Sequence, residues 1–152
     1  MIKLENVTIR RNEKRILNNV SWSMKKGEHW SILGLNGSGK TTLLKIINGY
    51  IWPTSGHVEV LGNVFGQANI LELRKEIGWV SSSLQQRLRN HDTALAIILS
   101  GKFASVGLYD HIDESDIDYA KHLMKLLDCE HIQDHPYEIL SQGERQGALI
   151  AL

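Results

Sequence analysis

The feature that most constrains this chain is a glycine-rich run at residues 34–41, made of Gly34, Leu35, Asn36, Gly37, Ser38, Gly39, Lys40 and Thr41. The run fits the phosphate-binding pattern G-x-x-x-x-G-K-[ST]. Residues 28–33 before it are half apolar and predict a strand, whereas residues 42–48 after it carry apolar side chains at helical spacing. A strand, a glycine loop and a helix are the context in which this pattern binds nucleotide phosphates.

The residue types of the run explain the chemistry. Gly37 and Gly39 allow successive backbone N–H groups to point at one phosphate, and no Cβ obstructs its approach. The start of the following helix adds unpaired N–H groups and the positive end of its dipole. We expect Lys40 to reach the β- and γ-phosphates, Thr41 to contact Mg²⁺ through its hydroxyl and Thr42 to touch the α-phosphate.

The composition excludes several classes of protein. The 152 residues carry 17 Lys and Arg against 17 Asp and Glu, so no net charge favours nucleic acid as a partner. The single cysteine, Cys129, cannot form an internal disulfide, and a reducing cytoplasm is its natural compartment. The chain opens at Met1 directly on an alternating pattern, and its apolar runs are too short for a membrane span. We expect a soluble cytoplasmic protein.

The order of the patterns predicts an α/β core with an inserted helical part. Strands are expected over residues 2–9, with a register shift near Asn6, and over 16–24, 57–62 and 78–81, with 10–15 as a hairpin loop. After Ser83 the pattern becomes helical. The predicted organisation is an α/β nucleotide-binding core at 1–83, a helical subdomain at 84–139, and a final part at 140–152.

Three helix starts are marked in the second half of the chain. Asp92 is a suitable N-cap for a helix over 93–100, and Asp113 or Ser115 begins a longer helix. Ser141 and Glu144 have the spacing of a capping box. The helix that they begin reaches Leu152 without a stop signal, so we expect the chain to end inside a domain.

The motif Leu140-Ser141-Gln142-Gly143-Glu144 resembles the signature of ABC-type ATPases, usually written Leu-Ser-Gly-Gly-Gln. Its position after a helical insertion, and the turn at residues 53–56 followed by a strand, are also similar to that family. The resemblance covers the whole chain. It implies a P-loop NTPase-type core, with a mixed sheet that has an N-terminal antiparallel part, an inserted helical subdomain, and a C-terminal part of the domain that is missing here.

The resemblance also implies partners and cofactors. Two such domains, two copies or two paralogues, meet head to tail around ATP and Mg²⁺. Ser141 and the backbone of Gln142 and Gly143, in the motif that Glu144 completes, would contact the γ-phosphate held by the partner. The leading interpretation is the ATP-binding subunit of an ABC transport system, an ATPase at the inner face of the cell membrane beside an integral membrane permease.

Three departures from the family pattern bear on function. The place of the aromatic residue that stacks on adenine falls near Arg10 or Arg11, where Arg11 either stacks on the base or belongs to a solvated basic loop. The family's metal-contacting glutamine is replaced near Ser82, and either Ser82 or a downstream glutamine, Gln85 or Gln86, is its substitute. The family's catalytic Asp and Glu and its switch His would follow Leu152, so the chain is expected to bind nucleotide and to hydrolyse little.

Two other classes of function compete with this interpretation. A soluble ABC-type ATPase acting in translation, repair or regulation would share both motifs, and the altered segment at 81–83 favours it slightly. A P-loop GTPase or small-molecule kinase would leave the signature unexplained, and no Asn-Lys-x-Asp guanine motif occurs. Co-purification with an integral membrane protein would separate the transporter subunit from the soluble ATPase.

Overall fold

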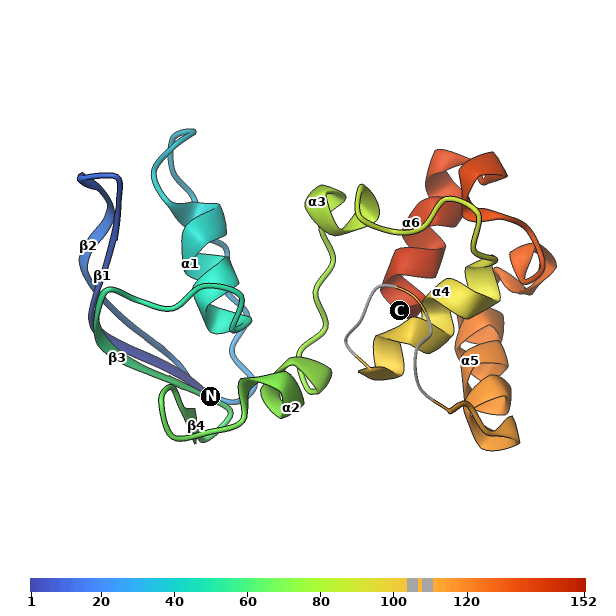
Figure 1. Cartoon of the computed structure of the whole chain (residues 1–152), viewed down its shortest axis with the longest axis horizontal. Helices are drawn as coiled ribbons and strands as arrows, with labels where there is room; N and C mark the ends of the chain where they lie inside the picture. The colour runs from blue at the N-terminus through green and yellow to red at the C-terminus, as the bar shows by residue number, and fades with distance from the viewer. Residues whose placement is uncertain (104–106, 108–110) are drawn as a thin grey trace. The chain divides into compact units, whose positions relative to one another are not determined.

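The computed structural model describes residues 1–103, 107 and 111–152. The chain forms two compact units, Met1–Ile77 and Gly78–Leu152, and each is described by itself. The first unit holds the strands together with two helices, and the second is helical (Figure 1). Residues 104–106 and 108–110 of the predicted helical stretch lie outside the described residues.

The first unit is built on a four-stranded sheet with the order β2-β1-β3-β4. Its strands are β1 (Ile2–Arg11), β2 (Lys14–Met24), β3 (Ser55–Val60) and β4 (Asn63–Val64), and the neighbouring strands in this order are antiparallel. The predicted hairpin is confirmed, but its loop is shorter than the expected 10–15, since Arg10 pairs with Arg15 and Arg11 with Lys14. The turn consists of Asn12 and Glu13 alone, and both have positive φ. A two-residue turn of this kind has a backbone twist that matches the twist of the two strands it joins.

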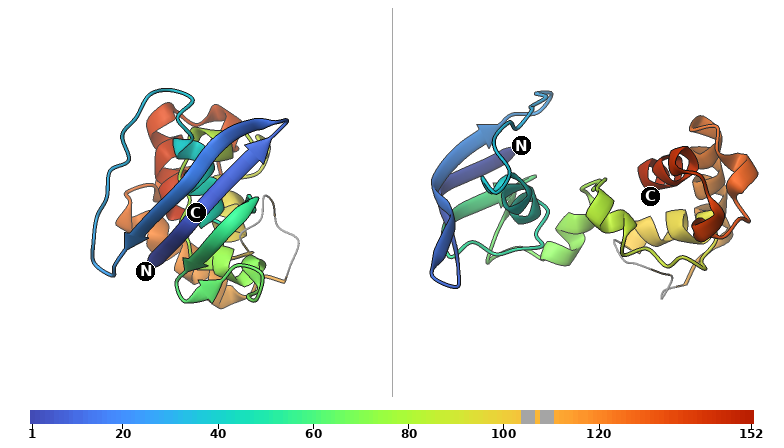
Figure 2. Two further views of the ribbon diagram at one scale, coloured as in Figure 1. Left: turned by 90° about the vertical axis from the view of Figure 1, so that its left-hand side faces the viewer. Right: turned by 90° about the horizontal axis from the view of Figure 1, so that it is seen from above.

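One face of this sheet carries the core of the first unit. Leu4, Val7 and Ile9 of β1 are buried together with residues of β2 and β3. The register shift predicted near Asn6 is confirmed by the irregularity between Leu4 and Val7. Helix α1 (Lys40–Ile47) lies over this face (Figure 2), where it buries Ile46 and Ile47, and α2 (Ile70–Lys75) adds Leu73.

Two predicted strands are not formed by the described residues. Residues 28–33 and 78–81 belong to no helix or strand and join no ladder, so these predictions are wrong. The side chain of Leu33 is 91% exposed and that of Trp30 is 55% exposed. The half-apolar pattern is suited to a strand, but a strand also needs a neighbour whose backbone groups it can pair with. The antiparallel part of the predicted sheet is present, and no parallel pair occurs among the described residues.

The second unit packs its helices around a separate apolar core. The helices are α3 (Ser82–Gln85), α4 (Ala94–Ser100), η1 (Gly101–Phe103), α5 (Glu114–Leu126), η2 (Glu130–Ile132), η3 (Tyr137–Ile139) and α6 (Gln142–Ala151). Met124, Ile132 and Tyr137 are almost fully buried in this core, together with the inner face of α6. The buried face of α6 includes Ala148 and Leu149.

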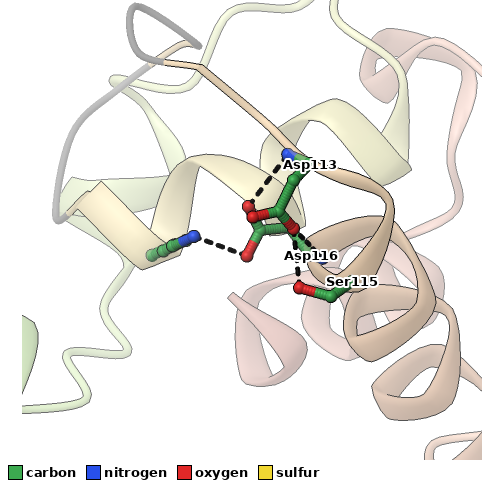
Figure 3. A network of polar contacts seen from close by, with 4 residues as sticks. Asp113, Ser115 and Asp116 are labelled. Carbon is green, nitrogen blue, oxygen red and sulfur yellow. Dashed lines mark hydrogen bonds and ion pairs between the residues drawn. The ribbon is translucent and has the colours of Figure 1, made fainter.

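The caps of two helices test the predicted starts. The prediction of Asp92 as the cap of α4 is wrong, because the hydroxyl of Thr93 accepts the N–H of Ala96 at 3.2 Å. The start of α5 is Asp113, the first of the two alternatives. Its carboxylate accepts the N–H of Asp116 at 3.0 Å, and the carboxylate of Asp116 accepts the N–H of Asp113 at 3.2 Å (Figure 3).

Candidate functional site

The glycine-rich run forms a tight loop that leads into α1. Gly37 and Gly39 have φ values of 83° and 94°, in the left-handed region that side chains disfavour. The N–H of Ser38 donates to the carbonyl of Leu35 at 3.2 Å and closes the turn between them. The pattern of glycines in the sequence is therefore matched by the backbone conformation that it predicts.

A pocket of about 300 Å³ lies at the end of the loop. Its walls come from the loop, the first turn of α1 and one residue of β2, namely Ile16, Asn36, Gly37, Gly39, Lys40, Thr41 and Thr42. The lining combines backbone, hydroxyl and ammonium groups with a single large apolar side chain. This composition suits an anionic group that many donors hold from one side.

The first turn of α1 supplies the donors of this pocket. The residue that precedes the helix is Gly39, which has no side chain to cap it, and the first intrahelical bond is that from the N–H of Leu43 to the carbonyl of Gly39 at 2.8 Å. The N–H groups of the residues between them have no partner within the helix. Together with the positive end of the helix dipole, they form a binding site for an anion.

The ammonium group of Lys40 lies inside the curve of the loop. Its Nζ donates to the carbonyl oxygen of Gly34 at 2.7 Å and to that of Leu35 at 2.9 Å. These two residues do not line the pocket, yet they hold the cation that does. The positive charge is thus positioned by the backbone of the same loop that curves around the pocket.

The predicted site residues differ in where they lie. Six of the nine at positions 34–42 line the pocket, two hold Lys40, and Ser38 makes the turn. Arg11 pairs with Lys14 beside the hairpin turn and does not line the pocket. Sequence reasoning missed Ile16, an apolar residue directly after the basic hairpin, which faces the pocket from β2.

The signature residues form the N-terminus of α6. The hydroxyl of Ser141 accepts the N–H of Glu144 at 3.4 Å, and the carboxylate of Glu144 accepts the N–H of Ser141 at 2.7 Å. The predicted capping box is therefore confirmed. Hydrogen bonds from Ser141, and after them the contact with His131, hold the pKa of Glu144 below its ordinary value. Gly143 leaves the start of the helix open, since a Cβ there would meet nothing within 4 Å.

Ser82 and Gln85 begin and end α3 in the second unit. Ser82 is exposed, and the helix is capped by the preceding residue, because the hydroxyl of Ser81 accepts the N–H of Leu84 at 3.1 Å. Neither residue lines the pocket of the phosphate loop. The choice between Ser82 and a downstream glutamine as the metal-side residue stays a prediction.

Comparison with known proteins places the chain in a family. The sequence profile of the family described as ABC transporter matches residues 17–152. A putative ABC transporter ATP-binding protein of Streptococcus mutans is 45% identical over 151 residues, which cover 99% of this chain and 58% of that protein. The chain belongs to the ABC transporter family. The ABC transporter ATP-binding protein ModF of Escherichia coli is 36% identical, over 98% of this chain and 31% of its own length.

Solved structures of ABC transporter cassettes share the fold. One, described as the dimeric structure of a bacterial ABC transporter cassette, has a TM-score of 0.81 and 30% identity, and covers 99% of this chain and 68% of its own. Another, a post-hydrolysis state of an ATP-binding cassette bound to ADP and Pi, has a TM-score of 0.79 at 31% identity, with coverages of 99% and 68%. The predicted ABC-type α/β fold is confirmed. In the part of the chain that the structure describes, no helix has the length and hydropathy to span a membrane.

Proposed function

We propose that this chain binds ATP at the loop of residues 34–42 and that, in the whole protein, it couples ATP binding and hydrolysis to movement of a membrane partner. The observation that carries the proposal is the loop itself, where left-handed glycines, the uncapped start of α1 and the ammonium of Lys40 converge on one pocket. The related cassette whose structure is described as bound to ADP and Pi supports nucleotide as the ligand.

The residues in and around the loop have separate roles in this proposal. Lys40 pairs with the β- and γ-phosphates, and the backbone N–H groups of the first turn of α1 hold the β-phosphate. Thr42 contacts the α-phosphate. Ile16 supports the ribose and base side of the nucleotide, because it is the one large apolar side chain in the lining. Arg11 stays a candidate for stacking on the base.

The pocket fits a magnesium ion that arrives with its nucleotide. The hydroxyl of Thr41 lines the pocket and supplies one oxygen ligand, and Mg²⁺ commonly takes most of its other ligands from substrate phosphates and water. No group of three or more His, Cys, Asp or Glu residues that would hold a metal by itself occurs among residues 1–103, 107 and 111–152. When bound, the ion would neutralise phosphate charge, while Lys40 orients the phosphates.

Hydrolysis by the 152-residue chain is expected to be slow. The described lining of the pocket includes no carboxylate. No carboxylate there can therefore act as a general base on the attacking water molecule. Binding needs only the cradle of donors, whereas phosphoryl transfer also needs an oriented nucleophile. The chain should therefore bind nucleotide far better than it turns it over.

The signature motif takes a second nucleotide in this proposal. Ser141 and the backbone of Gln142 and Gly143, at the start of α6, contact the γ-phosphate of ATP held by a second ABC domain. The related cassette whose structure is described as dimeric supports this arrangement. We also propose the division into a core at 1–83, a helical subdomain at 84–139 and a signature part at 140–152.

Calorimetric titration of the chain with ATP and Mg²⁺ tests the proposed binding. We expect saturable binding that is lost in Lys40→Ala and kept in Lys45→Ala, which removes a cation from the same helix outside the pocket. Equal binding by both variants would contradict the site. Recovery of the chain with an integral membrane protein would separate the transport function from that of a soluble ABC ATPase, the interpretation that Ser81 to Ser83 favour.

A further inference from the structure

Glu144 makes contacts on two sides at the start of α6. Its Oε2 accepts the N–H of Ser141 at 2.7 Å, and its Oε1 lies 3.3 Å from Nε2 of His131. Glu144 belongs to α6 and His131 to η2, so the contact joins two elements. The carboxylate thus connects the helix start to an imidazole that sequence reasoning did not associate with the signature.

The backbone on both sides holds this contact in place. Ile132, next to His131, is fully buried, and Cys129, one residue before η2, is 4% exposed. A Cβ at Gly147 would lie 3.9 Å from Cβ of Cys129, so the residue directly before η2 lies beside α6 one turn beyond Glu144. The side chains of His131 and Glu144 keep exposures of 62% and 32%, and protons from solvent can therefore reach the pair.

The charge of this pair changes when the imidazole titrates. The pair is neutral overall when His131 is protonated and carries one negative charge when it is not, since the two groups lie 3.3 Å apart. Asp128 and Glu130 lie on the side of η2, where their charges raise the pKa of the Cys129 thiol beyond the effect of burial.

The remaining charged groups nearby are occupied by other contacts. Arg145, the next residue of α6, donates to the carbonyl of Glu138 at 2.6 Å and lies over the ring of Tyr137. The carboxylate of Glu138 contacts Nδ1 of His91 at 3.4 Å. Among the described contacts of Glu144, His131 is therefore the side chain that becomes a cation on protonation.

We propose that the His131–Glu144 pair makes phosphate binding at the start of α6 dependent on pH, with tighter binding when His131 is protonated. This rests on the proposed function, in which Ser141 and Gly143 contact the nucleotide of a second copy. An unneutralised carboxylate within one turn of that contact repels the γ-phosphate, and protonation of His131 removes the repulsion. Glutamine, the usual residue of the family pattern at this position, keeps the shape and the hydrogen bonds without the charge.

Sedimentation of the 152-residue chain with saturating ATP and Mg²⁺ at pH 6 and pH 8 tests the proposal. We expect ATP-dependent self-association of the wild type to weaken about three- to tenfold between these values, as one unit charge at close range predicts. Glu144→Gln should associate equally at both pH values, as tightly as the wild type at pH 6. His131→Gln should be weak at both, whereas the control His135→Gln should behave as the wild type.

Two results overturn the inference in distinguishable ways. If Glu144→Gln keeps the pH dependence of the wild type, the pair does not control binding, although the proposed function stands. If the wild type binds ATP but shows no ATP-dependent association at either pH, the contact between copies is wrong and the inference falls with it. Amide NMR gives a separate readout, since the Gly143 N–H should follow the titration of His131 in the wild type and lose this response in Glu144→Gln.

Discussion

A Cβ at Gly39 would lie 2.6 Å from Cδ2 of Leu17, so the phosphate loop packs against β2 through a position that only glycine fills. The carbonyl oxygen of Ile16 is 3.0 Å from the same point, and Gly39 has a φ of 94°. This close approach is what brings Ile16 to the pocket beside the loop. The glycine of the motif thus serves the packing of the first unit as well as the conformation of the loop.

Gly39→Ala should destabilise the first unit and abolish ATP binding. The left-handed conformation costs a non-glycine residue about 1–2 kcal/mol, and overpacking against Leu17 costs about 1–3 kcal/mol more. Urea unfolding followed by tryptophan fluorescence measures the loss. Gly78→Ala is the matched control, because a Cβ there meets nothing within 4 Å and no positive φ is involved. A stability equal to that of the wild type in Gly39→Ala would contradict this packing.

Residues 29–35 should exchange their amide hydrogens much faster than residues 2–9. The segment joins no ladder in the described sheet, and Leu33 and Leu35 are 91% and 85% exposed, whereas β1 is paired on both sides. Unpaired, exposed backbone opens at almost no cost in free energy. Hydrogen exchange read by mass spectrometry compares the two segments within one sample. Protection of 29–35 equal to that of β1 would show that another part of the chain pairs with it.

Sequence patterns predict the structure correctly where a feature depends on residues that are neighbours in the sequence. The loop at 34–41, the capping box of Ser141 and Glu144, and the bulge near Asn6 each depend on a few adjacent residues, and each was predicted. The prediction of Asp92 as the cap of α4 failed because threonine also caps helices, and which residue is aligned with the N–H of Ala96 depends on how the turn enters α4.

Long-range pairing set the limit of sequence reasoning. Residues 28–33 have a suitable pattern for a strand, but whether they form one depends on a neighbouring strand that the described residues do not supply. Ile16 could be found only by knowing that β2 passes beside Gly39. The contact of His131 with Glu144 likewise joins η2 to α6 across 13 residues of sequence, which no local pattern marks.

Asp113→Ala should destabilise the second unit at neutral pH and much less at acid pH. The Ser115 hydroxyl and the Asp116 N–H donate to the Asp113 carboxylate, and with the Lys102 charge they lower its pKa. A lowered pKa in the folded state gives stability that is present above the unfolded value near 4 and is lost as the pH falls through the folded value.

Urea midpoints of Asp113→Ala and the wild type between pH 7 and pH 3 measure this effect. The difference between the two proteins should be constant from pH 7 to about pH 5 and should then shrink. Asp118→Ala, an exposed change on the same helix, is the control and should follow the wild type at each pH. A difference that grows toward acid pH would contradict the cap.

The thiol of Cys129 should be unreactive in the folded chain. Cys129 is 4% exposed, and burial, followed by the charges of Asp128 and Glu130, raises its pKa, so little thiolate is present at neutral pH. Ellman's reagent at pH 7.5 should label it at least about tenfold more slowly than in 8 M urea. Labelling at the same rate in both conditions would mean that the turn before η2 is open.

The most direct test of the central claim is the thermal stabilisation of the chain by ATP. Ligand at a hundred times its dissociation constant should add about 2.7 kcal/mol, which raises the Tm of a chain of this size by about 5–10 °C. Lys40→Ala removes the ammonium that Gly34 and Leu35 hold and should show no ATP-induced shift, while it melts within a few degrees of the unliganded wild type. An equal ATP-induced shift in Lys40→Ala and the wild type would contradict the assignment of this loop as the nucleotide site.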